Sequence, residues 1–154
     1  MNSIILIILI ILLNTIPFLI SRQWDMSNPT WYTKIRLPQT PPGYVFSIVW
    51  TLLYTLMAIA VFIIYQSPES DYKWLALILF SIQYVLNISF IPLYSQGRII
   101  ISNYIILLTL ITASMTTYLF SKLDTTAGLI MIPYLGWLIQ ALYFNNRLAE
   151  RLLL

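Results

Sequence analysis

Long runs of apolar residues, separated by short polar breaks, dominate the chain. Five runs stand out, at residues 1–20, 41–66, 72–95, 99–121 and 125–146. A helix of about 20 residues spans the roughly 30 Å hydrocarbon core of a bilayer. Because backbone groups in lipid must find their hydrogen bonds within the protein, each run is expected to be a helix. The pattern predicts an all-α integral membrane protein, a bundle of five transmembrane helices.

Polar and helix-breaking residues separate the predicted helices. The longest break is a polar loop at residues 21–40. Thr40 has the side chain of an N-cap, and Pro41 and Pro42 suit the first helical turn, where a missing N–H group costs nothing. Pro133 predicts a kink in the last helix. Since the other loops are short, the chain is expected to form one membrane domain, residues 1–154.

The first apolar run has a competing interpretation as a signal peptide. Such a peptide usually has a basic start and a small-residue cleavage site. Nothing basic precedes Arg22, and no such cleavage site follows the run. A retained helix is therefore the favoured interpretation.

The basic residues predict how the helices are oriented. Five spans place the first loop, the third loop and the C-terminus on one side of the membrane. That side carries six of the eight Lys and Arg residues: Arg22, Lys34, Arg36, Arg98, Arg147 and Arg151. Lys73 and Lys122 lie on the other side. Because basic loops are retained in the cytoplasm, the N-terminus is expected outside and the C-terminus inside.

Composition excludes several classes of function. Hydrophobic residues make up 60% of the chain and charged residues only 8%, with a net charge of +3. Without histidine or cysteine, disulfides, zinc sites, histidine-ligated haem and Ser-His-Asp or Cys-His catalysis are excluded, and no metal site is expected. The dispersed basic residues make no nucleic-acid-binding patch. Aromatic side chains remain abundant, with five Trp, eleven Tyr and seven Phe.

Polar and aromatic residues recur at helical spacing in three of the runs. They are Ser47, Trp50, Tyr54 and Ala58 in the second run, Gln83, Asn87 and Tyr94 in the third, and Tyr134, Trp137, Ala141 and Asn145 in the fifth. Because an amide that faces acyl chains is costly, each stripe is expected to face inward, where the three could line an aromatic pocket. Alternatively, Gln83 and Asn87 only join helices by hydrogen bonds, and the aromatic residues are ordinary packing.

Two further features concern the surface of the bundle. Trp31 and Tyr32 lie in the long loop beside prolines, which predicts a loop folded back against the protein. In the functional interpretation, this loop is a lid. The glycines (Gly43, Gly97, Gly128 and Gly136) form no G-x-x-x-G pair. The usual small-residue signature of a helix dimer is therefore missing, and a homodimer stays an open alternative.

Three segments together resemble a known family. They are WYTKIRLPQTPPGYVFSIVWTLLYTLMAIA (31–60), QYVLNISFIPLYSQGR (83–98) and IPYLGWLIQALYFN (132–145). Their order and residues resemble the signature blocks of the translocator protein family, also called the tryptophan-rich sensory protein or TspO/MBR family. With the five-span pattern, the resemblance covers nearly the whole chain.

The resemblance implies a five-helix bundle whose pocket opens towards the first loop. Members bind porphyrins, notably protoporphyrin IX, so a metal-free porphyrin is expected as a ligand, with no resident cofactor. Its planar macrocycle suits aromatic walls, and its carboxylates suit Lys34 and Arg36 at the mouth. The family further implies the mitochondrial outer membrane in a eukaryote, or an outer or cytoplasmic membrane in a bacterium.

The resemblance also assigns site residues by position. Trp50 and Trp137 match the tryptophans connected in some members with light-dependent breakdown of the porphyrin. With the inward stripes, the expected ligand-binding residues are Trp31, Tyr32, Tyr54, Asn87, Tyr134, Ala141 and Asn145. Tyr44 and Phe90 replace family tryptophans. Asn146 and Glu150 replace the tyrosine and arginine of a sterol motif, which disfavours sterol binding.

Three functions follow from this sequence. The favoured one is a membrane receptor for porphyrins and related apolar ligands. The alternatives are an enzyme that degrades porphyrin photo-oxidatively and a transporter of porphyrin or sterol-like ligands. Five spans do not divide into an inverted repeat, which counts against the transporter.

Overall fold

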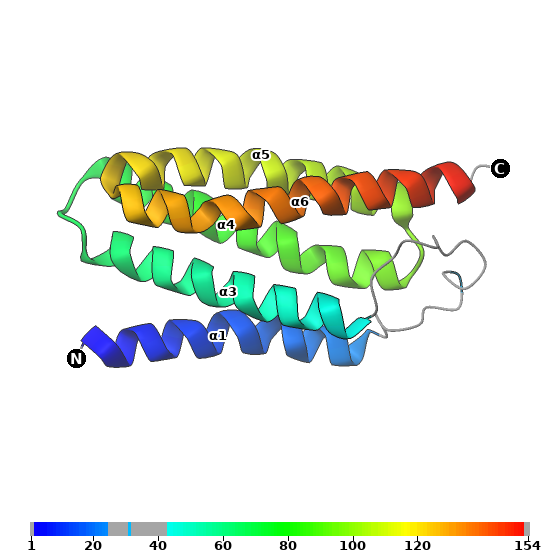
Figure 1. The fold of residues 1–154 in the computed structure, drawn as a ribbon, viewed down its shortest axis with the longest axis horizontal. Helices are drawn as coiled ribbons and strands as arrows, with labels where there is room; N and C mark the ends of the chain where they lie inside the picture. The colour runs from blue at the N-terminus through cyan, green and yellow to red at the C-terminus, as the bar shows by residue number, and fades with distance from the viewer. Residues whose placement is uncertain (1, 25–30, 32–42, 153–154) are drawn as a thin grey trace.

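The described residues form a bundle of five helices (Figure 1). The computed structural model describes residues 2–24, 31 and 43–152. In chain order the helices are α1 (Asn2–Gln23), α3 (Gly43–Gln66), α4 (Asp71–Ser95), α5 (Ile99–Leu123) and α6 (Thr125–Leu152). Each is long and apolar enough to cross a membrane. The expected all-α membrane fold is confirmed.

Helix α6 is longer than its apolar run predicts. It continues through Pro133 and beyond residue 146 to Leu152. The added turns keep one apolar side inward, because Leu148 is buried. Their exposed side carries an ion pair between Arg147 and Glu150, 3.0 Å apart, so this end needs no hydrocarbon around it. The proposed N-cap Thr40 and its two prolines lie outside the described residues.

Helices α4, α5 and α6 pack closely together, and α1 lies at the outside of the bundle along α3 (Figure 1). The Tyr84 hydroxyl of α4 donates to the backbone carbonyl of Leu13 in α1, at 3.0 Å. Helix α3 packs mainly on α1 and α6, and much less on α4 and α5. The chain ends lie at opposite ends of the bundle (Figure 1). Which end is cytoplasmic remains a prediction.

A buried lysine in the first turn of α4 closes the connection from α3. Lys73, only 3% exposed, donates to the Ser67 carbonyl at 3.0 Å and to Glu69 Oε1 at 2.8 Å. Its ammonium also lies 5.6 Å from the ring centre of Tyr65 and 5.8 Å from that of Trp74. The hydrogen bond from Lys73 lowers the pKa of Glu69. The lysine is therefore paired within the turn and connects α3 to α4.

Helices α5 and α6 approach each other closely just after their short connection. A Cβ atom on Gly128 would lie 2.5 Å from the Ser121 Cβ and 2.7 Å from its Cα. These are positions of main chain and of a rigid Cβ, so neither can rotate away. The α5–α6 pair can therefore pack at this distance only with glycine at position 128.

Substitution of Gly128 tests this packing. We expect Gly128→Ala to lower the free energy of unfolding by about 1–3 kcal/mol, the usual cost of overpacking. Gly136→Ala is the matched control, because its Cβ would meet nothing within 4 Å and alanine favours a helix by about 1 kcal/mol. Thermal unfolding in detergent measures both. A Gly128→Ala protein as stable as Gly136→Ala would contradict the packing argument.

Candidate functional site

Two tyrosine–amide hydrogen bonds join three helices in the centre of the bundle. The Tyr54 hydroxyl of α3 donates to Asn87 Oδ1 of α4 at 2.6 Å. The Tyr134 hydroxyl of α6 donates to Gln83 Oε1, one turn away on α4, also at 2.6 Å. All four side chains are buried. These residues face inward as predicted, and their amide oxygens do serve as interhelical hydrogen-bond acceptors.

Trp50 lies at the centre of an aromatic cluster between α3 and α6. It stacks on Tyr54 with ring centres 5.3 Å apart and planes 27° apart. It meets the edges of Tyr134 and Trp137, each with ring centres 6.4 Å away. Phe46 packs against the other side of Trp137, at 5.7 Å. Edge and stacked contacts of this kind stabilise one ring arrangement over others, so Trp50 is held on several sides.

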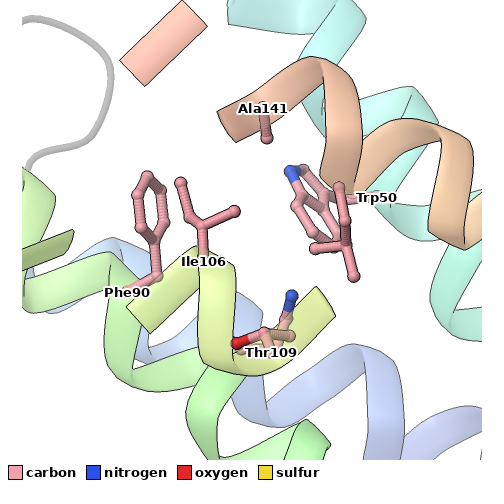
Figure 2. Close-up of a pocket in the computed structure, with 7 residues that line it drawn as sticks. Trp50, Phe90, Ile106, Thr109 and Ala141 are labelled. Atoms are coloured by element: carbon pink, nitrogen blue, oxygen red, sulfur yellow. The ribbon is translucent and has the colours of Figure 1, made fainter. Parts of the chain in front are cut away.

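A small cavity opens beside Trp50. Its lining residues are Trp50, Asn87, Phe90, Ile106, Thr109, Leu138 and Ala141. Figure 2 shows Phe90 and Ile106 facing Trp50 across the cavity, with Ala141 and Thr109 at opposite edges. Its volume is about 20 Å³. A space of this size holds about one water molecule.

One hydrogen-bond donor without a partner borders this cavity. Within the described residues, the Trp50 indole N–H makes no hydrogen bond, whereas the Asn87 side chain accepts from Tyr54 and also hydrogen-bonds to Tyr134. The Thr109 hydroxyl donates to the Ile105 carbonyl at 2.7 Å. The remaining walls are apolar or aromatic. The cavity therefore suits an apolar group that carries an acceptor atom.

Asn145 lies one turn beyond Ala141 on α6 and joins α6 to α5 by hydrogen bonds. Its amide nitrogen donates to the Ile99 carbonyl at 3.2 Å, to Ser102 Oγ at 3.1 Å and to Asn103 Oδ1 at 2.9 Å. Its own oxygen is buried and has no hydrogen-bond partner among the described residues. The side chain is not part of the cavity wall.

Trp31 folds back against the end of the bundle, as the sequence predicts for its loop. Its indole nitrogen donates to the Ser95 carbonyl at 3.1 Å, and its ring meets the edge of Tyr94 at 5.1 Å. A Cβ on Gly97 would lie 3.1 Å from the Trp31 ring, and Gly97 has a φ of 72°. Glycine thus permits both this backbone and the ring above it.

The structure sorts the predicted site residues into three groups. Those lining the cavity are Trp50, Asn87 and Ala141; those packed behind or beyond it are Tyr54, Tyr134, Trp137, Asn145 and Trp31. Tyr32, Lys34 and Arg36 lie outside the described residues. Ser47 departs from its predicted inward stripe. It is exposed, and its hydroxyl can face outward because it donates to the Gly43 carbonyl at 3.4 Å.

Four cavity residues were not predicted as ligand contacts: Phe90, Ile106, Thr109 and Leu138. Phe90 occupies a position where the family that the chain resembles has tryptophan, so the sequence already pointed to Phe90 as a candidate ligand contact. No such signal marks Ile106 and Thr109, because apolar residues lie on every side of α5 and hydroxyl-bearing residues lie on several sides. A helix of that composition does not reveal its inner face.

Comparison with known proteins places this geometry in context. The TspO/MBR family matches residues 4–150. The tryptophan-rich sensory protein of Cereibacter sphaeroides is 30% identical over 117 residues, 75% of this chain and 72% of that protein. The tryptophan-rich protein TspO of Bacillus cereus is 31% identical over 75% of this chain and 76% of its own. Translocator protein 2 of Mus musculus is 28% identical over 73% and 72%.

The Tyr54–Asn87 hydrogen bond can be tested by removing its donor. Tyr54→Phe leaves a buried acceptor unpaired, so we expect the free energy of unfolding to fall by about 1 kcal/mol. Tyr118→Phe is the control, since Tyr118 is 61% exposed and its hydroxyl makes no hydrogen bond among the described residues. Denaturant titration in mixed micelles measures both. Equal stability of the two variants would show that the bond contributes nothing.

Proposed function

This chain belongs to the TspO/MBR family, and on that premise we propose that it is a membrane receptor for porphyrins, with protoporphyrin IX as the first ligand to test. The observation that carries the proposal is the cavity beside Trp50. It combines aromatic walls and apolar side chains with one unused donor, the Trp50 indole N–H, in the interior of a membrane bundle.

The chemistry of the walls matches that of a metal-free porphyrin. A flat macrocycle stacks on aromatic rings such as Trp50 and Phe90. Its imine nitrogens and carboxylates are acceptors to which the indole N–H of Trp50 can donate. Lys34 and Arg36 are proposed to hold the carboxylates at the mouth.

The cavity has to widen to admit a macrocycle. Small-molecule sites are usually about 300 Å³ or larger, whereas this cavity measures about 20 Å³. The wall most suited to move is α3, because it packs sparsely on α4 and α5. A shift of α3 would carry Trp50 away from Phe90 and Ile106. The ligand would then fill the space between these side chains.

Titration with protoporphyrin IX tests the receptor. We expect saturable quenching of tryptophan fluorescence in the dark and an affinity that falls about fivefold or more in Trp50→Leu, because a stacked aromatic pair contributes about 1 kcal/mol. Trp74→Leu is the matched control, since Trp74 is 52% exposed at the far end of the bundle. Porphyrin absorbance reports binding independently of the tryptophan removed. Equal affinities in the two variants would place the ligand elsewhere.

A second candidate, photo-oxidative degradation of the porphyrin, is supported by the Trp50–Trp137 pair. An excited porphyrin can take an electron from a neighbouring indole, and Trp137 lies edge-on to Trp50 at 6.4 Å, close enough to resupply it. Under illumination in air, we expect bound porphyrin to bleach, and to bleach more slowly in Trp137→Phe at equal occupancy. Stable absorbance in the unsubstituted protein would favour a receptor alone.

A further inference from the structure

An exposed amide lies in the middle of α6. Gln140 is fifteen residues after the start of the helix and twelve before its end. At a rise of 1.5 Å per residue these distances are roughly 22 Å and 18 Å, so the residue lies within a hydrocarbon core of about 30 Å. Its side chain makes no hydrogen bond within the described residues. Because an unpaired amide in hydrocarbon is costly, Gln140 points to a partner outside the chain.

Gln140 belongs to a stripe of exposed residues along the outside of α6. Its members follow one another at intervals of three or four: Leu129, Ile132, Gly136, Gln140 and Tyr143. Residues at this spacing share one side of a helix, and we call this side the α6 outer face. It differs from the side of α6 that brings Leu138 and Ala141 to the cavity.

Gly136 makes the α6 outer face open to close approach. A Cβ atom on Gly136 would meet nothing within 4 Å, so the packing of the described residues does not require glycine there. The residue lies one turn before Gln140 on the same side of the helix. Small residues at this kind of surface let a second transmembrane helix come near enough for hydrogen bonds between helices. Gly136 therefore gives another helix access to the unpaired amide.

We propose that the α6 outer face is the contact surface of a parallel dimer, in which Gln140 of each copy pairs with Gln140 of the partner subunit. Two copies inserted in the same orientation are related by a two-fold axis along the membrane normal. Equivalent residues then meet at equal depth. A glutamine amide carries two donor hydrogens and an acceptor oxygen. Two such amides across the axis satisfy each other through a reciprocal pair of N–H···O bonds.

Other occupants match this face less well. An acyl chain brings no hydrogen-bonding group and leaves the amide unpaired. A different transmembrane helix would need a polar residue at this same depth, whereas a second copy supplies one by symmetry. Arg147 continues the stripe towards the end of α6, but it forms an ion pair with Glu150 at 3.0 Å. Each copy therefore brings both charges to the contact, and the arginines do not drive the copies apart.

Cysteine crosslinking in liposomes at low protein density tests the surface, because the chain has no cysteine of its own. Single cysteines are placed on the α6 outer face (Ile132→Cys or Tyr143→Cys), on α4 (Ile82→Cys) and on α5 (Leu108→Cys), all at exposed positions. Under oxidation with copper phenanthroline, we expect disulfide-linked dimers from the two α6 positions only. Dimers from the α4 or α5 position, equal dimers from all four, or no dimers at all overturn the proposal.

Substitution of Gln140 tests the amide pair. Energy transfer between donor- and acceptor-labelled copies, followed as lipid is added, measures the dissociation constant of the dimer. We expect Gln140→Leu to weaken association about tenfold, the value of two hydrogen bonds between membrane helices. Gln140→Asn keeps an amide and should retain part of the affinity. Gly136→Ile should also weaken association, because its side chain holds the helices apart.

Ser114→Leu is the matched control. Ser114 is an exposed residue of α5 whose hydroxyl donates to the Leu110 carbonyl at 2.7 Å, so its loss should leave the dissociation constant unchanged. Circular dichroism checks that each variant keeps its helices. A Gln140→Leu protein that associates as tightly as the unsubstituted chain, or no more weakly than Ser114→Leu, contradicts the amide pair. Since no porphyrin is present, the result is independent of the receptor proposal.

Discussion

Hydrocarbon is as apolar as the side chains of this bundle, so burying leucine or isoleucine between its helices gains little over leaving them in lipid. What distinguishes one helix arrangement from another is where the few polar side chains find partners. Tyr54 with Asn87 and Tyr134 with Gln83 provide those partners at the centre, each at 2.6 Å. The positions of α3 and α6 relative to α4 depend on these two bonds.

The same constraint produces the cavity. Asn87 can face the interior because Tyr54 donates to its oxygen and Tyr134 is a second hydrogen-bond partner. The same side chain borders the space beside Trp50. Asn87 therefore fits both interpretations of the polar stripes, interhelical hydrogen bonding and cavity lining. Gln83, whose nitrogen instead lies 3.7 Å from the Met57 sulfur, is engaged entirely between helices.

The sequence by itself determined the five helices, because runs of about twenty apolar residues in lipid have no other way to pair their backbone groups. It also determined that Tyr54, Asn87 and Tyr134 face inward, since their polar atoms recur at helical spacing. It did not determine the cavity. Ile106 and Thr109 line it from α5, whose apolar residues surround the whole helix, and Trp137 was expected there but packs behind Trp50. Only the tertiary structure decides such positions, because they depend on how neighbouring helices rotate and approach one another, which no period within a single helix records.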